Sequence, residues 1–154
     1  MKKARLILSA SMLTVFAFAS ATMVSCNKDE KDTTCPLGKE GENCETLSRD
    51  KFIGIWDGTD ECDSSSVEYI MTIDTSSTNT LNVLISNPSA YGDEIKVTGN
   101  LTASNVVTLT NVDVGGQRTM SGTFTVNGNT LTTEYVVTPS VGNADHCSGT
   151  FTKQ

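Results

Sequence analysis

The sequence is poor in the residues that most catalytic and metal sites use. It contains one histidine, His146, and none of its five cysteines stands in a C-x-x-C pair. A serine triad needs a histidine base, and zinc sites built from thiolates need closely spaced cysteines. The neighbour of His146 is Cys147, which we expect to be bridged and therefore not a nucleophile. We expect no catalytic residue, no cofactor and no enzyme activity.

Basic residues are also scarce. The chain has 11 Lys and Arg against 18 Asp and Glu, and three of the basic residues lie within the first 25 positions. Without those positions the count is 11 − 3 = 8 basic residues, and the net charge is 8 − 18 = −10. An acidic surface disfavours nucleic acid as a partner. A divalent cation, a basic protein or a small ligand remains open as a partner.

The N-terminus has the charge pattern of a secretory signal. Lys2, Lys3 and Arg5 precede an uncharged, largely apolar run from Leu6 to Val24. A basic region followed by an apolar region is typical of signal peptides. The run is also close to the ~20 residues that a membrane span needs, so an uncleaved transmembrane helix is the alternative.

The end of this run resembles a known processing site. Met23-Val24-Ser25-Cys26 resembles the lipobox of bacterial lipoprotein signal peptides. The resemblance implies a signal peptide over residues 1–25, cleavage before Cys26 and acylation of that cysteine with chains such as palmitate. Several acyl chains anchor a protein stably to a membrane. The alternative is an unmodified cysteine at position 26.

Residues 26–34 form the predicted acylated tether. They read "CNKDEKDTT", a run of mixed charge typical of a flexible linker. Lys28-Asp29-Glu30 resembles the surface-export tag of Bacteroidota lipoproteins. This resemblance implies an outer-membrane lipoprotein at the cell surface, with the inner leaflet of the outer membrane as the alternative.

Acylation of Cys26 would leave four cysteines. An even number in an exported chain indicates two disulfides, and of three possible pairings we favour Cys35–Cys44 and Cys62–Cys147. Residues 35–50 begin with "CPLGKEGENC", a C-x-x-G-x-x-G-x-x-C pattern. This pattern looks like the last disulfide loop of an EGF-like module and implies a stalk knob or a domain cap.

Residues 51–154 are predicted to be all-β. Apolar and polar residues alternate with period two, Thr and Val dominate, and Asn127-Gly128 is a strong hairpin signal. Eight strands in sequential hairpins favour an antiparallel up-and-down barrel, with a β-sandwich as the alternative. A Cys62–Cys147 bridge would join the first strand to the last. The expected strands contain FIGIWDGT, VEYIMTID, TLNVLIS, EIKVTG, NVVTLTN, RTMSGTFTVNG, NTLTTEYVVTP and HCSGTFTK.

The first predicted strand contains a short family motif. Gly54-Ile55-Trp56 resembles the G-x-W that opens lipocalins, in which the tryptophan closes the base of the barrel. The resemblance implies a lipocalin-like topology. The last strand has no arginine to cover Trp56, and the simpler interpretation of Trp56 is a core residue beside a glycine.

Four acidic residues flank Cys62. Carboxylates at this density are weak candidates for a calcium site, because Ca²⁺ takes oxygen ligands. Their spacing does not match a D-x-D-x-D-G loop, so we expect a solvated acidic turn and no metal. The four residues are Asp57, Asp60, Glu61 and Asp63.

These features together predict a lipid-anchored cell-envelope lipoprotein with a non-enzymatic binding or structural role. Its contact with the membrane would be the lipid on Cys26. The alternative is a lipocalin-like carrier of a small apolar ligand inside the barrel.

Overall fold

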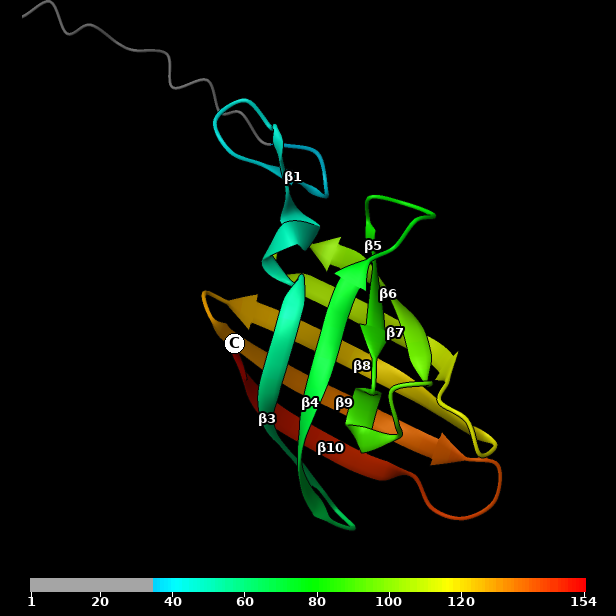
Figure 1. Ribbon diagram of the computed structural model, residues 1–154. Coiled ribbons are helices and arrows are strands. Elements are labelled where there is room, and N and C mark those ends of the chain that lie inside the picture. The colour runs from blue at the N-terminus through cyan, green and yellow to red at the C-terminus, as the bar shows by residue number, and fades with distance from the viewer. Residues whose placement is uncertain (1–34) are drawn as a thin grey trace, which may run out of the picture. The chain divides into compact units, whose positions relative to one another are not determined.

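The computed structural model describes residues 35–154 (Figure 1). The predicted signal peptide, Cys26 and the predicted tether lie outside the described residues. Within the described part of the chain, no helix is both long enough and apolar enough to cross a membrane.

Eight antiparallel strands form one closed barrel, in the order β10-β3-β4-β5-β6-β7-β8-β9. Each strand pairs with the next one in sequence, and β10 closes the barrel by pairing with β3. This confirms the predicted all-β, lipocalin-like up-and-down barrel and not the sandwich. The strands are β3 (Gly54–Cys62), β4 (Ser66–Thr75), β5 (Asn82–Ser86), β6 (Lys96–Ala103), β7 (Val106–Asp113), β8 (Arg118–Asn127), β9 (Thr130–Pro139) and β10 (Asp145–Lys153).

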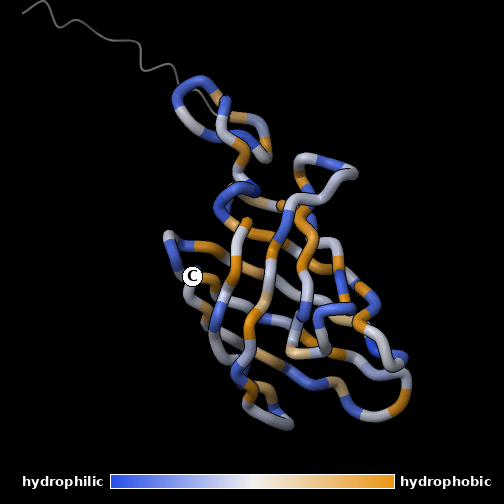
Figure 2. The backbone as a smooth tube through the Cα atoms, in the orientation of Figure 1, coloured by the Kyte–Doolittle hydropathy of each residue, from blue (hydrophilic) through white to orange (hydrophobic). Residues whose placement is uncertain are grey.

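Alternating side chains fill the barrel. In β9, every second residue from Leu131 to Val137 is buried and the residues between them are mostly exposed. Figure 2 shows the same change between apolar and polar positions along the strands. Because successive side chains point to opposite faces of a strand, one face forms the core and the other meets water. The largest fully buried side chains are Trp56, Phe52, Phe124, Phe151, Met71, Ile73, Ile85, Leu109, Met120, Leu131, Val83 and Val107.

We call the end of the barrel that holds Trp56 the base. Trp56 is fully buried, and its Nε1 donates to the carbonyl oxygen of Phe52 at 2.7 Å. Lys153 of β10 lies over the indole, with Nζ 5.3 Å from the ring centroid, and donates to the carbonyl oxygen of Lys51 at 3.1 Å. A lysine therefore covers the tryptophan at the position where the sequence lacks an arginine. The cation and the ring face attract each other electrostatically.

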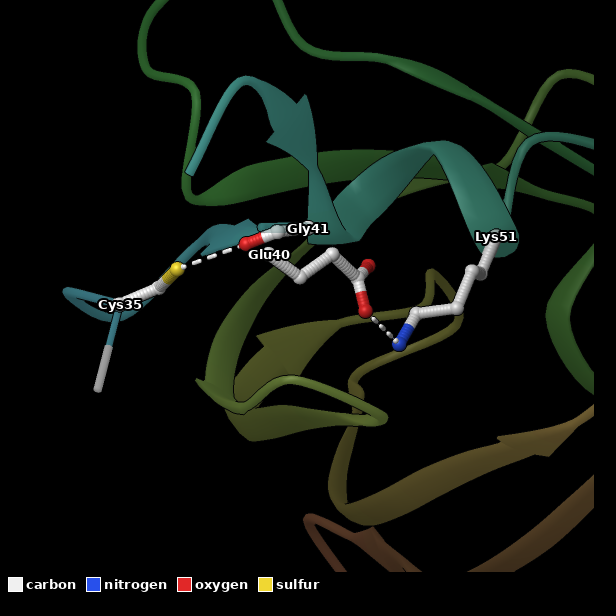
Figure 3. A network of polar contacts seen from close by, with 4 residues as sticks. All are labelled: Cys35, Glu40, Gly41 and Lys51. Carbon is white, nitrogen blue, oxygen red and sulfur yellow. Dashed lines mark hydrogen bonds and ion pairs between the residues drawn. The ribbon is translucent and has the colours of Figure 1, made fainter. Parts of the chain in front are cut away.

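The N-terminal loop lies beyond the base. It contains β1 (Lys39–Glu40), β2 (Thr46–Leu47) and the 3-10 turn η1 (Ser48–Lys51), and the Cys35–Cys44 disulfide closes it. Lys51 pairs with Glu40 at 2.9 Å, and Cys35 Sγ lies 3.4 Å from the carbonyl oxygen of Gly41 (Figure 3). The pair of Lys51 and Glu40 links the loop to the turn that leads into the barrel, and the contact of Cys35 with Gly41 lies within the loop.

Arg49 joins this loop to the barrel. Its Nη1 donates to the carbonyl oxygens of Ser76, at 3.1 Å, and Asn79, at 2.9 Å, both in the connection between β4 and β5. Ser48 of the same turn is fully buried. The arrangement fits the interpretation of the disulfide loop as a cap on the domain.

The opposite end of the barrel, the mouth, carries the loops 87–95, 113–118 and 139–145. Near it, the second disulfide joins Cys62 of β3 to Cys147 of β10, which are direct partners in the strand register. Both disulfides favoured from the sequence are therefore present in the structure.

Replacing Cys62 and Cys147 together by alanine should lower the free energy of unfolding by about 4–5 kcal/mol. The bridge spans 85 positions, and opening such a long loop returns entropy to the unfolded chain. Urea unfolding followed by Trp56 fluorescence would measure the loss.

The matched control replaces Cys35 and Cys44, whose bridge spans 9 positions. Its shorter loop predicts a smaller loss, of about 2–3 kcal/mol. A control loss equal to that of the Cys62–Cys147 variant would contradict the role of the long bridge in closing the barrel.

Candidate functional site

One carboxylate lies inside the otherwise apolar barrel. The Asp60 side chain is 0% exposed. Its Oδ2 accepts hydrogen bonds from Tyr69 Oη, at 2.5 Å, and from Tyr135 Oη. Its Oδ1 accepts one from Thr133 Oγ1 at 3.0 Å. All three partners are neutral hydroxyl groups, so none of the groups that bond to the Asp60 carboxylate carries a positive charge.

The alternation of β3 places Asp60 inside. Trp56 and Asp60 are four residues apart on one strand, so both point to the inner face. Directly opposite Asp60 on β10 is Gly149. A Cβ atom at Gly149 would overlap Asp60 Oδ1 and would lie 2.7 Å from Thr133 Oγ1. The glycine therefore leaves the space that the carboxylate and the threonine hydroxyl occupy.

Burial and the Asp60 charge both act on the two tyrosines. Burial raises the pKa of the Tyr69 phenol well above its ordinary value, and the neighbouring Asp60 carboxylate raises it further. The pKa of Tyr135 is raised by the same two causes in the same order. Both phenols therefore stay protonated at neutral pH and donate to Asp60.

A short segment at the mouth is fastened to these tyrosines. We call residues 87–91, which include the 3-10 turn η2 (Pro88–Ala90), the lid. The backbone N–H of Ser89 donates to Tyr69 Oη at 3.0 Å, and Ser89 Oγ lies 2.7 Å from Tyr135 Oη, within hydrogen-bond distance. The two tyrosines thus connect the lid to Asp60.

The lid backbone is strained. Asn87, Ser89 and Ala90 have φ angles of 58°, 56° and 57°, in the left-handed region, and none of them is glycine. Each such residue costs roughly 1–3 kcal/mol and persists only where its surroundings impose it. The Asn87 side chain supplies part of that constraint, because it donates to the carbonyl oxygen of Ile70 and accepts from the N–H of Gly92, both at 2.8 Å.

An open pocket of about 540 Å³ lies at the mouth, next to the lid. Tyr91, the last lid residue, forms part of its wall. The Arg118 guanidinium carbon lies 4.3 Å from the centroid of the Tyr91 ring, and Arg118 Nε donates to the carbonyl oxygen of Gly115 at 3.3 Å. The lining residues are Asp63, Ser64, Tyr91, Arg118, Val137, Pro139, Asn143, Ala144 and Asp145.

Two carboxylates share this pocket with Arg118. Asp145 accepts hydrogen bonds from the N–H and the hydroxyl of Ser64. Asp63 Oδ2 accepts from the N–H of His146 at 3.4 Å. The polar part of the pocket lining is therefore an arginine stacked on an aromatic ring and two hydrogen-bonded carboxylates. Val137 and Pro139 add apolar surface to the same pocket.

The structure does not bring the four acidic residues predicted around Cys62 together. Asp60 points into the barrel, whereas Asp57 and Glu61 alternate with it and face outward, and Asp63 lies beyond the strand end. The expectation of a solvated acidic turn is wrong for Asp60, because β3 continues through this segment to Cys62. The two-residue alternation that starts at Trp56 was the signal that could have placed Asp60 inside.

The histidine predicted to be non-catalytic lies next to a disulfide near the mouth. His146 is exposed on β10, beside the bridged Cys147. Potential ligand atoms of Cys62, Asp145 and Cys147 lie close together. Both sulfurs of that group belong to the disulfide, so they offer no thiolate to a metal.

Comparisons with known proteins add no family to this geometry: no protein-family model matches the chain, and no curated protein matches its sequence. The arrangement of Asp60, the two tyrosines, the lid and the mouth pocket is suited to binding a ligand.

The free energy of unfolding should fall as the pH rises above about 10, the ordinary pKa of tyrosine. Tyr69 and Tyr135 ionise there in the unfolded chain, whereas in the folded chain their raised pKa keeps them protonated. The stabilisation by the two protonated tyrosines is complete below the pKa that they have in the unfolded chain. It is lost as the pH rises from that value toward their higher pKa in the folded chain. Each tyrosine should contribute a loss of about 1.4 kcal/mol per pH unit.

Urea unfolding at a series of pH values on both sides of the tyrosine pKa would measure this slope. The variant that carries Tyr69→Phe and Tyr135→Phe should be less stable at neutral pH and should show a smaller slope in alkali, because neither ring can then ionise. An unchanged slope in that variant would refute the assignment of the alkaline loss to these two residues.

Proposed function

We propose that this chain is a lipid-anchored lipoprotein of the bacterial outer membrane with a non-enzymatic binding role. The observation that carries the proposal is the position of Cys26, directly after a signal-like apolar run and at the end of a lipobox-like motif. The two disulfides use the other four cysteines, so no cysteine of the chain remains as a partner for Cys26. Two disulfides also fit an exported protein.

The position of the cap supports an anchor on the base side. The described chain begins at Cys35, in the disulfide loop that Arg49 joins to the base. A lipid on Cys26 would therefore attach through the end of the domain that lies opposite the mouth.

The mouth pocket supports the binding role. Its volume of about 540 Å³ lies within the range of roughly 300–1,000 Å³ of small-molecule sites. A lipocalin-like carrier of a small apolar ligand is a second candidate, favoured by the apolar surfaces of Tyr91, Val137 and Pro139 in the pocket. Large apolar side chains such as Trp56 and Phe124 fill the interior nearer the base. In both candidate functions, the ligand would therefore bind at the mouth.

Replacing Cys26 by alanine should release the protein from membranes, because the acyl chains that anchor it would have no attachment point. Fractionation of cells grown with labelled palmitate would measure both the location and the label. The variant with alanine at Cys35 and Cys44 is the matched control and should remain labelled and membrane-bound. If the Cys26→Ala protein stays in the membrane fraction, the apolar run is an uncleaved transmembrane helix.

Replacing Lys28, Asp29 and Glu30 together by alanine should move the protein from the cell surface to the inner leaflet of the outer membrane. The substitution removes the segment that resembles a surface-export tag and leaves the lipid in place. Digestion of intact cells with added protease would measure exposure. The control variant replaces Lys31 and Asp32, and equal exposure of all three proteins would contradict a role for the tag.

A further inference from the structure

We propose that Asp60 is the anionic centre of a binding site for a small organic cation, a primary amine with a short apolar body, which enters when the lid moves aside. The inference rests on the proposed binding role and names its ligand class. The cationic group would bond to Asp60 and to the two tyrosines, and the apolar body would lie in the mouth pocket.

The carboxylate lacks a countercharge. The three hydroxyl groups around Asp60 satisfy its hydrogen bonds, but a buried charge without an opposite charge remains costly. Within residues 35–154, one ion pair forms, between Lys51 and Glu40 at the base of the barrel, and it does not involve Asp60. If Asp60 served only to hold the lid through the two tyrosines, a neutral asparagine at this position could do the same.

The lid occupies positions that an ammonium group could take. Ser89 presents its N–H to Tyr69 Oη, and its hydroxyl lies within hydrogen-bond distance of Tyr135 Oη. A primary ammonium carries three N–H donors and could donate to the Asp60 carboxylate and to both phenol oxygens at once. Such charge-assisted hydrogen bonds are stronger than the neutral ones that Ser89 makes.

Strain in the lid would offset part of the cost of displacing it. Three of its residues are held in the left-handed region without being glycine, and movement of the lid would relieve that strain. Breaking two hydrogen bonds would separate Ser89 from the two tyrosines, whereas the bonds of Asn87 to Ile70 and Ile95 hold the start of the lid in place.

The mouth pocket lies next to the Asp60 network along β9. Val137 lies two residues beyond Tyr135 on the inner face of β9, and it lines the pocket together with Tyr91 of the lid. An apolar body of a few carbon atoms attached to the ammonium would meet Tyr91, Val137 and Pro139 on its way out. The site would thus join a charged centre to an apolar passage.

The charge around the mouth favours a cation. Asp63 and Asp145 outnumber Arg118 in the pocket lining, and acidic residues outnumber basic ones in the whole chain. A negative potential raises the local concentration of cations. Arg118 is held by the Tyr91 ring and by the carbonyl of Gly115, and it forms no ion pair with Asp60.

The test is calorimetric titration of the acylated full mature chain in lipid nanodiscs, with empty nanodiscs as the reference. The probes are 2-phenylethylamine, a cation at neutral pH, and 2-phenylethanol, a neutral molecule of similar size. The amine should bind more tightly than the alcohol. Asp60→Asn keeps the size of the side chain but removes its charge, so it should weaken amine binding about tenfold or more and leave the alcohol unaffected.

A second variant tests the lid and does not depend on the folding of Asp60→Asn. Ser89→Ala removes the hydroxyl that contacts Tyr135 and should favour the open lid, so affinity for the amine should rise severalfold. Ser140→Ala is the matched control, because Ser140 lies in another mouth loop and bonds to Gln117. This control should leave the affinity unchanged.

Two outcomes would overturn the proposal. One is a dissociation constant for the amine of about 1 mM or weaker in both the unchanged chain and the Ser89→Ala variant. The other is equal affinity for amine and alcohol with no effect of Asp60→Asn, which would identify a carrier of apolar ligands. Neither outcome bears on the membrane anchor, because release of the Cys26→Ala protein is measured separately by fractionation.

Discussion

The pairing of β10 with β3 is the interaction on which the rest of this structure depends. It turns a sequence of hairpins into a closed barrel, and the Cys62–Cys147 bridge covalently joins the same two strands. The pairing places Gly149 opposite Asp60 and lets Lys153 reach the ring of Trp56. Both the base and the carboxylate site near the mouth are therefore consequences of one strand contact.

The Asp60 site carries a cost in stability that the proposed ligand binding would explain. An apolar residue at position 60 would fit the surrounding core without the cost of a buried charge. The barrel instead surrounds the carboxylate with Tyr69, Thr133 and Tyr135, and it adds a strained lid above them. Costs of this kind are expected where a site must hold a ligand and exclude water, and they are hard to explain in a domain that serves only as a spacer.

The fold could be predicted from the sequence because burial on one face imposes a period of two, as in the segments around Met71 and Tyr135. The site could not. Asp60 receives its hydrogen bonds from residues up to 75 positions away, and no local pattern reports that proximity. Its surroundings in the sequence, rich in Asp and Gly, are also those of a turn. Likewise, Lys153 covers Trp56 only because β10 lies beside β3.

Closure of the barrel also limits how other proteins can associate with this one. Every barrel strand has two neighbours, but some stretches pair on one side only: β4 pairs with β5 from Thr72 to Thr75, so β5 does not cover the half of β4 nearer the mouth. Association by strand addition, a common route both to peptide recognition and to aggregation, is therefore limited on the barrel to short stretches of this kind. A protein partner would otherwise recognise side chains on the outer wall or on the loops, such as the exposed Val141 near the mouth.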